Sequence, residues 1–397
     1  MKRALPEKAR HTGRNLIRDV FERGAGIPGF ISFGIGNPAP EAIPVELIRD
    51  TVCEVISDNT MEYLQYGPMN GDAHLAGQIR KRLVDVKGFP TVEQSVLISV
   101  GSGQCLGLVP RTLCDVGDEV YMERFTFTSG IHAVRNAGAT AVPIASDDDG
   151  MIPEALEAAA KSGKGRYIYL IPNFQNPTGI TMSETRRKEI YDIASRYDLY
   201  IYEDDPYGEI RFAGEPVPAF KSFDVDNRVI YAGSYSKTLS AGLRVGFLYG
   251  PADIIEAIQL LKNNSDGQMP LLTQRVVSRV LDTIDYEAQI AKTREIYGRK
   301  CRLLRDTLIE KGSSKVKYTN PEGGMFLWMT LPEGADSDAF FEACIAEKVG
   351  IVTGAAFAVD PADGSNAFRL SYTVPTEEEI LVGAAVVAET TKRFFGE

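Results

Sequence analysis

The stretch Ser95-Val-Leu-Ile-Ser-Val-Gly-Ser-Gly-Gln104 has the form of a buried β-strand that runs into a glycine-rich turn and then into a helix. Residues 95–100 are small or apolar, and the apolar residues from Cys105 onward follow a helical pattern. Strand–turn–helix units of this kind build α/β domains, in which crossover helices join parallel strands. The stretch therefore predicts an α/β fold with a glycine-rich turn at the carboxyl end of a strand.

The same alternation of short apolar runs and amphipathic stretches continues along the chain. Strands are predicted at residues 95–100, 118–122, 139–144, 166–171, 199–203, 228–233 and 244–249, and helices at residues 128–137, 153–161 and 184–197. Because consecutive strands joined by helices lie parallel in one sheet, this pattern predicts a mostly parallel seven-stranded sheet flanked by helices.

A different pattern begins near residue 285. Long charged helical patterns at residues 286–311 and 337–348 alternate there with strand-like runs such as Gly324-Met-Phe-Leu-Trp-Met-Thr330, which predicts a smaller α+β domain. The chain starts with an arginine-rich helical pattern followed by Phe30-Ile-Ser-Phe-Gly-Ile-Gly-Asn-Pro38, and we expect this segment to complete the small domain and line the cleft. The predicted divisions are residues 1–45, 46–285 (the large domain) and 286–397.

The composition favours a small-molecule substrate. The net charge of −11 disfavours nucleic acids and membrane surfaces as partners, because both are polyanions. No apolar run approaches a membrane span and the start of the chain lacks the apolar core of a secretion signal, so we expect a cytoplasmic protein. Five cysteines without a CxxC pair and three scattered histidines predict neither a disulfide framework, nor a metal site, nor a Ser/His/Asp triad.

One loop combines a lysine, two hydroxyls and an arginine: Ser234-Tyr-Ser-Lys-Thr-Leu-Ser-Ala-Gly-Leu-Arg-Val-Gly-Phe247. An amine that is positioned and can lose its proton captures the aldehyde of pyridoxal phosphate as a Schiff base, and Lys237 is the candidate. Arg244, Ser234 and Ser236 could hold the phosphate of this cofactor. The alternative is a surface lysine in a Ser/Gly loop, which only residues elsewhere in the chain can exclude.

The turn Gly101-Ser-Gly-Gln104 is a second candidate for phosphate binding. Its backbone N–H groups and the Ser102 hydroxyl lie at the start of a predicted helix, where the helix dipole favours an anion. A purely structural glycine turn is the alternative.

The acidic run Tyr202-Glu-Asp-Asp-Pro-Tyr-Gly208 follows the predicted strand at residues 199–203. A carboxylate at this point would keep the pyridine nitrogen of the cofactor protonated, so that the ring withdraws electrons. Charge alone does not separate Asp204 from Asp205, and a solvated acidic turn is the alternative. Tyr207 could hydrogen-bond the 3′ oxygen of the ring.

Three further segments near predicted strands carry side chains that could bind the cofactor or a substrate. Asn176, in Asn173-Phe-Gln-Asn-Pro-Thr-Gly179, could donate to the phenolic oxygen of the cofactor, although a plain turn also explains this sequence. Either phenylalanine of Arg124-Phe-Thr-Phe-Thr-Ser129 could stack on the ring or pack in the core. Arg369, in Asn366-Ala-Phe-Arg-Leu-Ser-Tyr372, could bind a carboxylate through two parallel hydrogen bonds or be an edge-strand surface charge.

These motifs, in this order, resemble those of the class I/II pyridoxal phosphate aminotransferases of fold type I, the aspartate aminotransferase-like fold. The resemblance covers nearly the whole chain. It is nearest to the subgroup of 2-aminoadipate, kynurenine and aromatic aminotransferases, through Leu64-Gln-Tyr-Gly-Pro68, Pro172-Asn-Phe-Gln-Asn-Pro-Thr-Gly179 and Gly323-Gly-Met-Phe-Leu-Trp328.

The resemblance implies a role for each matched residue. Lys237 would carry the cofactor and move the proton, Asp204 rather than Asp205 would pair with the pyridine nitrogen, and Asn176 and Tyr207 would contact the 3′ oxygen. Phe127 would stack on the ring, and Arg369, with Asn176 and Gly36, would bind the substrate. The implied phosphate ligands are Ser102, Gly103, Gln104, Ser234, Ser236 and Arg244.

The resemblance also implies a homodimer, because Tyr66 matches a tyrosine that reaches the phosphate in the neighbouring subunit. Arg18 matches an arginine that reads the distal carboxylate of dicarboxylic substrates, or else it is a helix-surface arginine. Three positions depart from the family pattern and leave the substrate open: Phe127 lacks a tyrosine hydroxyl, Gly103 replaces a glutamine and Pro206 replaces an alanine.

The expected reaction is transamination between an L-amino acid of 2-aminoadipate, glutamate or aromatic type and a 2-oxo acid such as 2-oxoglutarate. Two rival hypotheses remain. A lyase or decarboxylase of the same fold would use the same lysine and aspartate, and a ligand-sensing domain would bind the cofactor without turnover.

Overall fold

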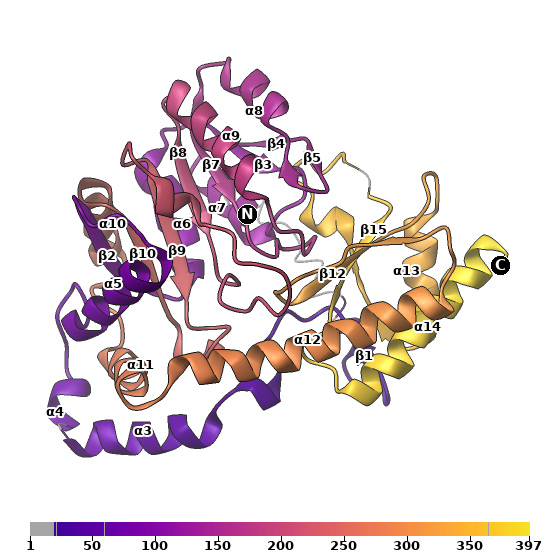
Figure 1. Cartoon of the computed structure of the whole chain (residues 1–397), viewed down its shortest axis with the longest axis horizontal. Coiled ribbons are helices and arrows are strands. Elements are labelled where there is room, and N and C mark those ends of the chain that lie inside the picture. Colours follow the sequence, from indigo (N-terminus) through magenta and orange to yellow (C-terminus); the bar gives the residue numbers. More distant parts are fainter. Residues whose placement is uncertain (1–19, 21, 59, 364) are drawn as a thin grey trace, which may run out of the picture.

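The computed structural model describes residues 20, 22–58, 60–363 and 365–397. A large sheet covered by helices lies at one end of the molecule and a smaller sheet at the other (Figure 1). The long helix α12 (Tyr286–Lys311) runs past both. We call the two parts the large-sheet region and the small-sheet region.

The large sheet has seven strands in the order β2-β10-β9-β8-β7-β3-β4. They are β2 (Gln94–Val100), β3 (Glu119–Glu123), β4 (Thr140–Ile144), β7 (Gly165–Leu170), β8 (Tyr200–Asp204), β9 (Val229–Ser234) and β10 (Val245–Pro251). Only β10 is antiparallel to its neighbours. The predicted mostly parallel seven-stranded sheet is therefore confirmed.

Helices cover the large sheet, and this explains why its central strands are apolar on both sides. Every residue of β10 is buried, as is nearly every residue of β7, β8 and β9. The helices of this region are α3 (Val45–Asp58), α4 (Thr60–Tyr63), α5 (Ala73–Lys87), α6 (Ser102–Leu113), α7 (Thr128–Asn136), α8 (Pro153–Ala160), α9 (Glu184–Arg196), α10 (Ala252–Asp266) and α11 (Leu271–Thr283). The three helices predicted between strands correspond to α7, α8 and α9.

The sheet order brings distant loops to one edge. The parallel strands all end there, and the antiparallel β10 begins there, since Val245 pairs with Val100 at the end of β2 and Gly246 pairs with Ser234 at the end of β9. One edge of the sheet therefore carries both Arg244, the residue that precedes β10, and the loops that follow β2, β3, β7, β8 and β9. In α/β sheets, this edge is where ligands bind.

The small sheet is antiparallel, in the order β11-β12-β15-β14, and its strands are β11 (Lys317–Tyr318), β12 (Phe326–Thr330), β14 (Val352–Thr353) and β15 (Ala367–Ser371). It is accompanied by α12, α13 (Ser337–Ala346) and α14 (Glu377–Phe395). The strand β1 (Ile31–Ser32) pairs with β13 (Val349–Gly350), so the segment before α3 joins the small-sheet region. The exact domain boundaries at residues 45/46 and 285/286 remain predictions.

Short elements complete the fold: β5 (Ser146–Asp147), β6 (Gly150–Met151), η1 (Pro40–Ala42), η2 (Phe220–Phe223), η3 (Ala241–Leu243) and η4 (Gly354–Phe357). None of the described helices is long and apolar enough to cross a membrane.

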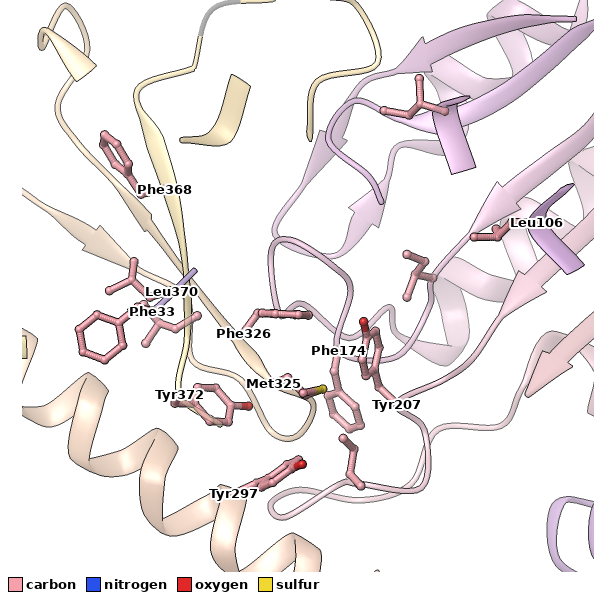
Figure 2. Packing of buried hydrophobic residues seen from close by; sticks show 14 of the residues in the cluster. Phe33, Leu106, Phe174, Tyr207, Tyr297, Met325, Phe326, Phe368, Leu370 and Tyr372 are labelled. Carbon is pink, nitrogen blue, oxygen red and sulfur yellow. The ribbon is translucent and has the colours of Figure 1, made fainter. Parts of the chain in front are cut away.

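One buried apolar cluster joins the two regions. In Figure 2, Phe326 at the start of β12 extends toward Phe174 and Tyr207, which belong to loops at the edge of the large sheet. The rings of Phe326 and Tyr207 meet edge to face, with 5.9 Å between their centroids. The small-sheet region thus holds these loops in place.

Candidate active site

A cavity of about 590 Å³ lies at the edge of the large sheet, against the small-sheet region. It is lined by Ile35, Gly36, Asn37, Ser102, Gly103, Phe127, Ile171, Asn176, Asp204, Pro206, Tyr207, Ser234, Ser236, Lys237, Ala241, Arg244, Phe326 and Arg369. Twelve of the predicted site residues are in this set: Gly36, Ser102, Gly103, Phe127, Asn176, Asp204, Tyr207, Ser234, Ser236, Lys237, Arg244 and Arg369.

Lys237 reaches the cavity from the turn that follows β9. Its Nζ donates a hydrogen bond to the carbonyl oxygen of Gly36, at 2.9 Å. Burial, together with the positive charges of Arg369 and Arg244, lowers the pKa of this amine to about 8. A minority of the amines, about one in five, is therefore neutral near pH 7.4, and the neutral form is the one that Schiff base formation requires.

The structure separates the two aspartates that charge alone could not. Asp204 lines the cavity: its Oδ2 accepts a hydrogen bond from the Tyr169 hydroxyl at 2.9 Å, while its buried Oδ1 has no partner among the described residues. Asp205 lies outside the cavity lining, and its carboxylate accepts hydrogen bonds from Asn173 at 2.9 Å and Tyr231 at 2.8 Å. Lys87 lies 3.4 Å from the same carboxylate.

The two carboxyl groups have opposite pKa shifts. Burial raises the pKa of Asp204 to about 7, the Tyr169 hydrogen bond opposes this rise, and the charge of Asp205 adds to it. The pKa of Asp205 is lowered because Lys87 and its hydrogen bonds outweigh its burial. The carboxylate of Asp205 thus has hydrogen-bond and charge partners within the protein, whereas Asp204, a lining residue of the cavity, keeps a buried acceptor without a partner in the described structure.

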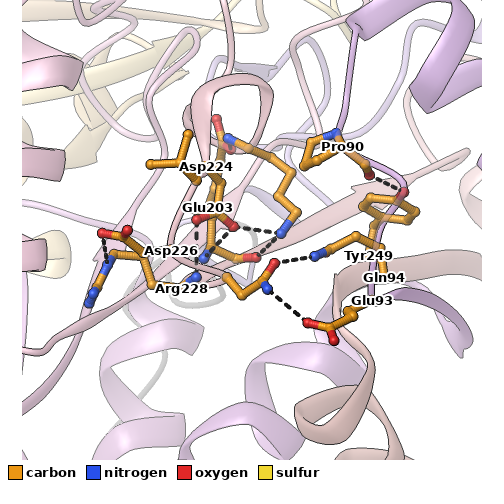
Figure 3. A network of polar contacts seen from close by, with 12 residues as sticks. Pro90, Glu93, Gln94, Glu203, Asp224, Asp226, Arg228 and Tyr249 are labelled. Carbon is orange, nitrogen blue, oxygen red and sulfur yellow. Dashed lines mark hydrogen bonds and ion pairs between the residues drawn. The ribbon is translucent and has the colours of Figure 1, made fainter.

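The preceding residue, Glu203, takes no part in the cavity. Its carboxylate accepts hydrogen bonds from the backbone N–H groups of Phe220 and Lys221, both at 3.0 Å. Figure 3 shows it in the polar network that contains Asp224 and Arg228. Because side chains alternate along a strand, Asp204 points to the opposite side from Glu203.

Arg244 and the start of α6 form an anion-binding end of the cavity. Nη2 of Arg244 donates to the Val100 carbonyl at 3.0 Å. A Cβ atom on Gly101, whose φ is 68°, would lie 2.5 Å from that Nη2, so this close approach requires glycine. Ser102 is the first residue of α6, and the Ser234 hydroxyl donates to that of Ser236 at 2.9 Å.

Arg369 lies at the other end of the cavity. Its Nη1 donates to Asn176 Oδ1 at 2.9 Å and its Nη2 to the Gly34 carbonyl at 2.7 Å. Its buried Nε has no hydrogen-bond partner among the described residues. Burial lowers the pKa of this guanidinium to about 10, and the neighbouring Tyr207 opposes the shift.

Three cations, Lys237, Arg244 and Arg369, therefore line one cavity, and none forms an ion pair with a carboxylate in the described part of the chain. Pyridoxal phosphate fits these residues. Its phosphate matches Arg244 and the start of α6, its aldehyde matches Lys237, and its ring N–H matches the unpartnered oxygen of Asp204. Arg369 matches no group of the cofactor and is left to bind a second anion.

A comparison with protein families decides the classification. The family "Aminotransferase class I and II" matches residues 28–387. The chain belongs to this family. It is a pyridoxal phosphate-dependent aminotransferase of the aspartate aminotransferase-like fold.

Individual relatives cover almost all of this aminotransferase. Aromatic-amino-acid aminotransferase 1 of Thermococcus litoralis is 36% identical over 91% of this chain and 88% of its own length. The 2-aminoadipate transaminase of Thermus thermophilus is 32% identical over 92% of this chain and 91% of its own. A crystal structure of kynurenine aminotransferase from Pyrococcus horikoshii, in complex with PMP, superposes with a TM-score of 0.93 at 34% identity and covers 98% of this chain and 97% of that one.

Three predicted site residues of the aminotransferase do not line the cavity. The Gln104 side chain accepts from the Val100 N–H at 2.9 Å and donates to Asp266 at 2.6 Å, so it bridges the ends of β2 and α10. Tyr66 is 88% exposed to solvent in the single chain. Arg18 lies outside the described residues.

The sequence did not reveal the residues that support the site. Tyr169 and Tyr202 are directly paired on neighbouring strands, and this register lets the Tyr169 hydroxyl reach Asp204 two residues further on. Lys87 comes from the end of α5, far away in the sequence. A strand pattern alone could have indicated that Tyr169 faces inward, but no local signal identifies Lys87 as the partner of Asp205.

The two phenylalanines that could stack on the ring also separate. Phe127 lines the cavity. Phe125 packs against Trp328 instead, with 5.6 Å between the ring centroids. Phe326 also forms part of the cavity wall, although the sequence patterns did not identify it as a site residue.

Proposed function

We propose that this aminotransferase moves the amino group of an L-amino acid to a 2-oxo acid such as 2-oxoglutarate, with Lys237 as the residue that carries the cofactor and transfers the proton. The observation that carries this proposal is the single cavity lined both by three basic side chains without ion-pair partners among the described residues and by Asp204, whose buried Oδ1 has no partner there. When bound, pyridoxal phosphate supplies an electron-withdrawing ring for bond breaking at the substrate α-carbon.

We assign each part of the cofactor to a different group of cavity residues. Asp204 accepts the ring N–H, because its Oδ1 is the buried acceptor that lacks a partner. Asn176 and Tyr207 lie beside one another and bind the 3′ oxygen, while Phe127 covers a face of the ring. The proposed phosphate ligands are Ser102, Gly103, Ser234, Ser236 and Arg244.

Lys237 acts as the base in this proposal. Its lowered pKa, about 8, leaves the amine able to take a proton from the substrate α-carbon. The Gly36 carbonyl, which accepts from Nζ at 2.9 Å, orients the amine within the cavity. The same Nζ would hold this proton until it is passed on, so one residue would serve both the removal and the delivery of the proton.

Arg369 binds the substrate α-carboxylate, since its guanidinium has free N–H donors at the cavity and no carboxylate partner in the described ranges. Gly36 contributes its backbone beside the substrate.

The wall of the cavity favours a substrate with an apolar side chain. Ile35, Ile171 and Phe326 supply apolar surface, and the three lining cations are already assigned to aldehyde, phosphate and α-carboxylate. We therefore place aromatic amino acids first among the 2-aminoadipate, glutamate and aromatic types. One relative is named for aromatic amino acids and one solved structure for kynurenine, while another relative is named for 2-aminoadipate, so the order rests on the cavity wall. The proposed binding of a distal carboxylate by Arg18 would matter only for dicarboxylic substrates.

A single-turnover experiment tests the reaction class. Phenylalanine added alone to the cofactor-loaded enzyme should convert the cofactor to its amine form and release phenylpyruvate in a one-to-one ratio, and 2-oxoglutarate should then restore the starting spectrum. Release of carbon dioxide or ammonia instead would favour a decarboxylase or lyase. Tight cofactor binding without any spectral change would favour a ligand-sensing domain.

We also propose a homodimer with shared active sites. The segment from α4 to residue 69 exposes several apolar side chains: Met61, Leu64, Tyr66 and Met69 are 73%, 62%, 88% and 60% exposed. Such a surface is typical of an interface, and Tyr66 would reach the phosphate of the second subunit. Mixing Lys237→Ala and Tyr66→Ala subunits should restore activity, because one site of each mixed dimer then lacks both changes. Monomers in solution with full activity would contradict this arrangement. The cytoplasmic location remains a prediction from sequence.

A further inference from the structure

The guanidinium of Arg369 is enclosed by two aromatic rings. Its central carbon lies 4.3 Å from the ring centroid of Phe326 and 4.7 Å from that of Phe357. Arg369 is on β15, Phe326 begins β12 on one side of it, and Phe357 ends η4, which follows β14 on the other side. The two rings thus come from the chain segments that flank β15.

Phe357 differs from Phe326 in its relation to the cavity. Phe326 forms part of the wall, whereas Phe357 is fully buried and is not among the lining residues. Its ring meets that of Trp328 at 72°, with 6.3 Å between the centroids. A substrate in the cavity would therefore contact Phe326 directly but would sense Phe357 only through Arg369.

The backbone around Phe357 is tied to the loop that carries the proposed ring platform. The Phe357 carbonyl accepts from the Thr126 N–H at 2.9 Å, and the Ala356 carbonyl accepts from the Thr128 hydroxyl at 2.9 Å. Thr126 and Thr128 are the two neighbours of Phe127 along the chain. The segment η4 thus connects Arg369 in the small-sheet region with Phe127 in the large-sheet region.

A buried arginine without a carboxylate needs another source of stabilisation. Aromatic ring faces attract a guanidinium most strongly where water is excluded. A ring against the planar face of a guanidinium leaves the in-plane N–H groups free, and these are the groups that form two parallel hydrogen bonds with a carboxylate. Asn176 and the Gly34 carbonyl accept hydrogen bonds from two N–H groups of Arg369, and its remaining N–H groups are available to a ligand.

We propose that Phe357 is a positioning residue for Arg369: its ring holds the charged guanidinium in the orientation that receives a substrate carboxylate, and its backbone fixes that orientation relative to Phe127. The inference rests on the proposed binding of the α-carboxylate by Arg369. It makes Phe357 a determinant of carboxylate affinity although its side chain does not reach the cavity.

The test measures binding of 3-phenylpropionate to the cofactor-loaded enzyme by absorbance titration. Phe357→Leu keeps an apolar side chain but removes the ring face, so the Kd should rise about fivefold to thirtyfold. Binding of 3-phenylpropanol, which has the same ring and chain without a carboxylate, should change less than twofold. The matched control is Phe340→Leu, because Phe340 is equally buried in the small-sheet region but packs on Phe368 and Phe394.

Arg369→Lys separates the two proposals. If it raises the Kd of 3-phenylpropionate while Phe357→Leu leaves that Kd within twofold, the role of Phe357 is wrong and that of Arg369 stands. If Arg369→Lys also has no effect, the proposed carboxylate binding by Arg369 is wrong. Equal losses for the acid and the alcohol in Phe357→Leu, or an equal loss of acid binding in Phe340→Leu, would show a general packing defect and overturn the inference. Phe357→Met replaces Phe357→Leu if the latter does not fold.

Discussion

Replacing Asp204 with asparagine should stabilise the cofactor-free protein above pH 7 and weaken its binding of the cofactor. The side chain is buried at the wall of the cavity, and its Oδ1 has no partner in the described structure. An asparagine has the same shape and can still accept the hydrogen bond from Tyr169 at 2.9 Å. The substitution therefore removes the charge and leaves the packing nearly unchanged.

The size of the effect follows from the pKa of Asp204, which rises from its ordinary value of 3.8 to about 7 in the folded protein. Because the folded-state pKa is the higher one, the contribution of this group to stability is fully present below pH 3.8 and is lost as the pH rises to about 7. At about 1.4 kcal/mol per pKa unit, the loss above pH 7 is about 4 kcal/mol. Cofactor-free Asp204→Asn should be more stable than the parent at pH 8 by up to about that amount.

With the cofactor bound, the stability gained by Asp204→Asn should shrink, because the variant binds the cofactor less tightly. A hydrogen bond between a charged ring N–H and a buried carboxylate contributes about 1.5–3 kcal/mol, so Asp204→Asn should weaken cofactor binding by about 10- to 150-fold. Urea unfolding at pH 5 and pH 8, with and without cofactor, measures both effects, and a fluorescence titration gives the cofactor Kd.

Asp205→Asn is the control, since its carboxylate pairs with the partly buried Lys87 at 3.4 Å. It should destabilise the cofactor-free protein by about 3–5 kcal/mol, because Lys87 loses its closest charged partner. Cofactor binding should change much less. A cofactor-free Asp204→Asn variant that is less stable than the parent at pH 8 would refute the reasoning.

Three further predictions concern the cofactor end of the cavity. Lys237→Ala should abolish both turnover and the covalent cofactor adduct that borohydride reduction leaves on the parent protein in its mass spectrum; a persistent adduct would assign the Schiff base to another lysine. Because burial and two cations lower the pKa of Lys237 to about 8, capture of pyridoxal by the cofactor-free protein should accelerate through a midpoint near pH 8, and Arg244→Gln should move that midpoint upward; a midpoint near 10.5 in the parent would contradict the assignment. Gly101→Ala should weaken pyridoxal phosphate binding at least tenfold but affect pyridoxal little, because its Cβ would lie 2.5 Å from Arg244 Nη2. Gly107→Ala, within the helix α6 that follows, meets no atom within 4 Å and should leave both affinities unchanged.

Local sequence patterns determined most of the fold. Each large-sheet strand was predicted within two residues of its observed ends, because a strand buried on both faces must be a short apolar run between turns. The long helix α12 was predicted at its observed bounds, since a charged stretch with a 3.6-residue apolar period has few other stable structures. The same patterns placed Lys237, Asn176 and the acidic run directly after strands, and sheet topology then brings such residues to one edge.

Pairwise relations between distant residues were decided only by the tertiary structure. Asp204 and Asp205 are chemically alike and adjacent, and they differ because Lys87, 118 positions earlier in the sequence, lies beside one of them while the cavity opens beside the other. The enclosure of Arg369 by Phe326 and Phe357 likewise depends on the order β12-β15-β14. Periodicity reports which side of a strand is buried, because that depends on neighbours along the chain. Which residue lies against that side depends on contacts between segments far apart in the sequence. These contacts form only when the sheets and helices assemble.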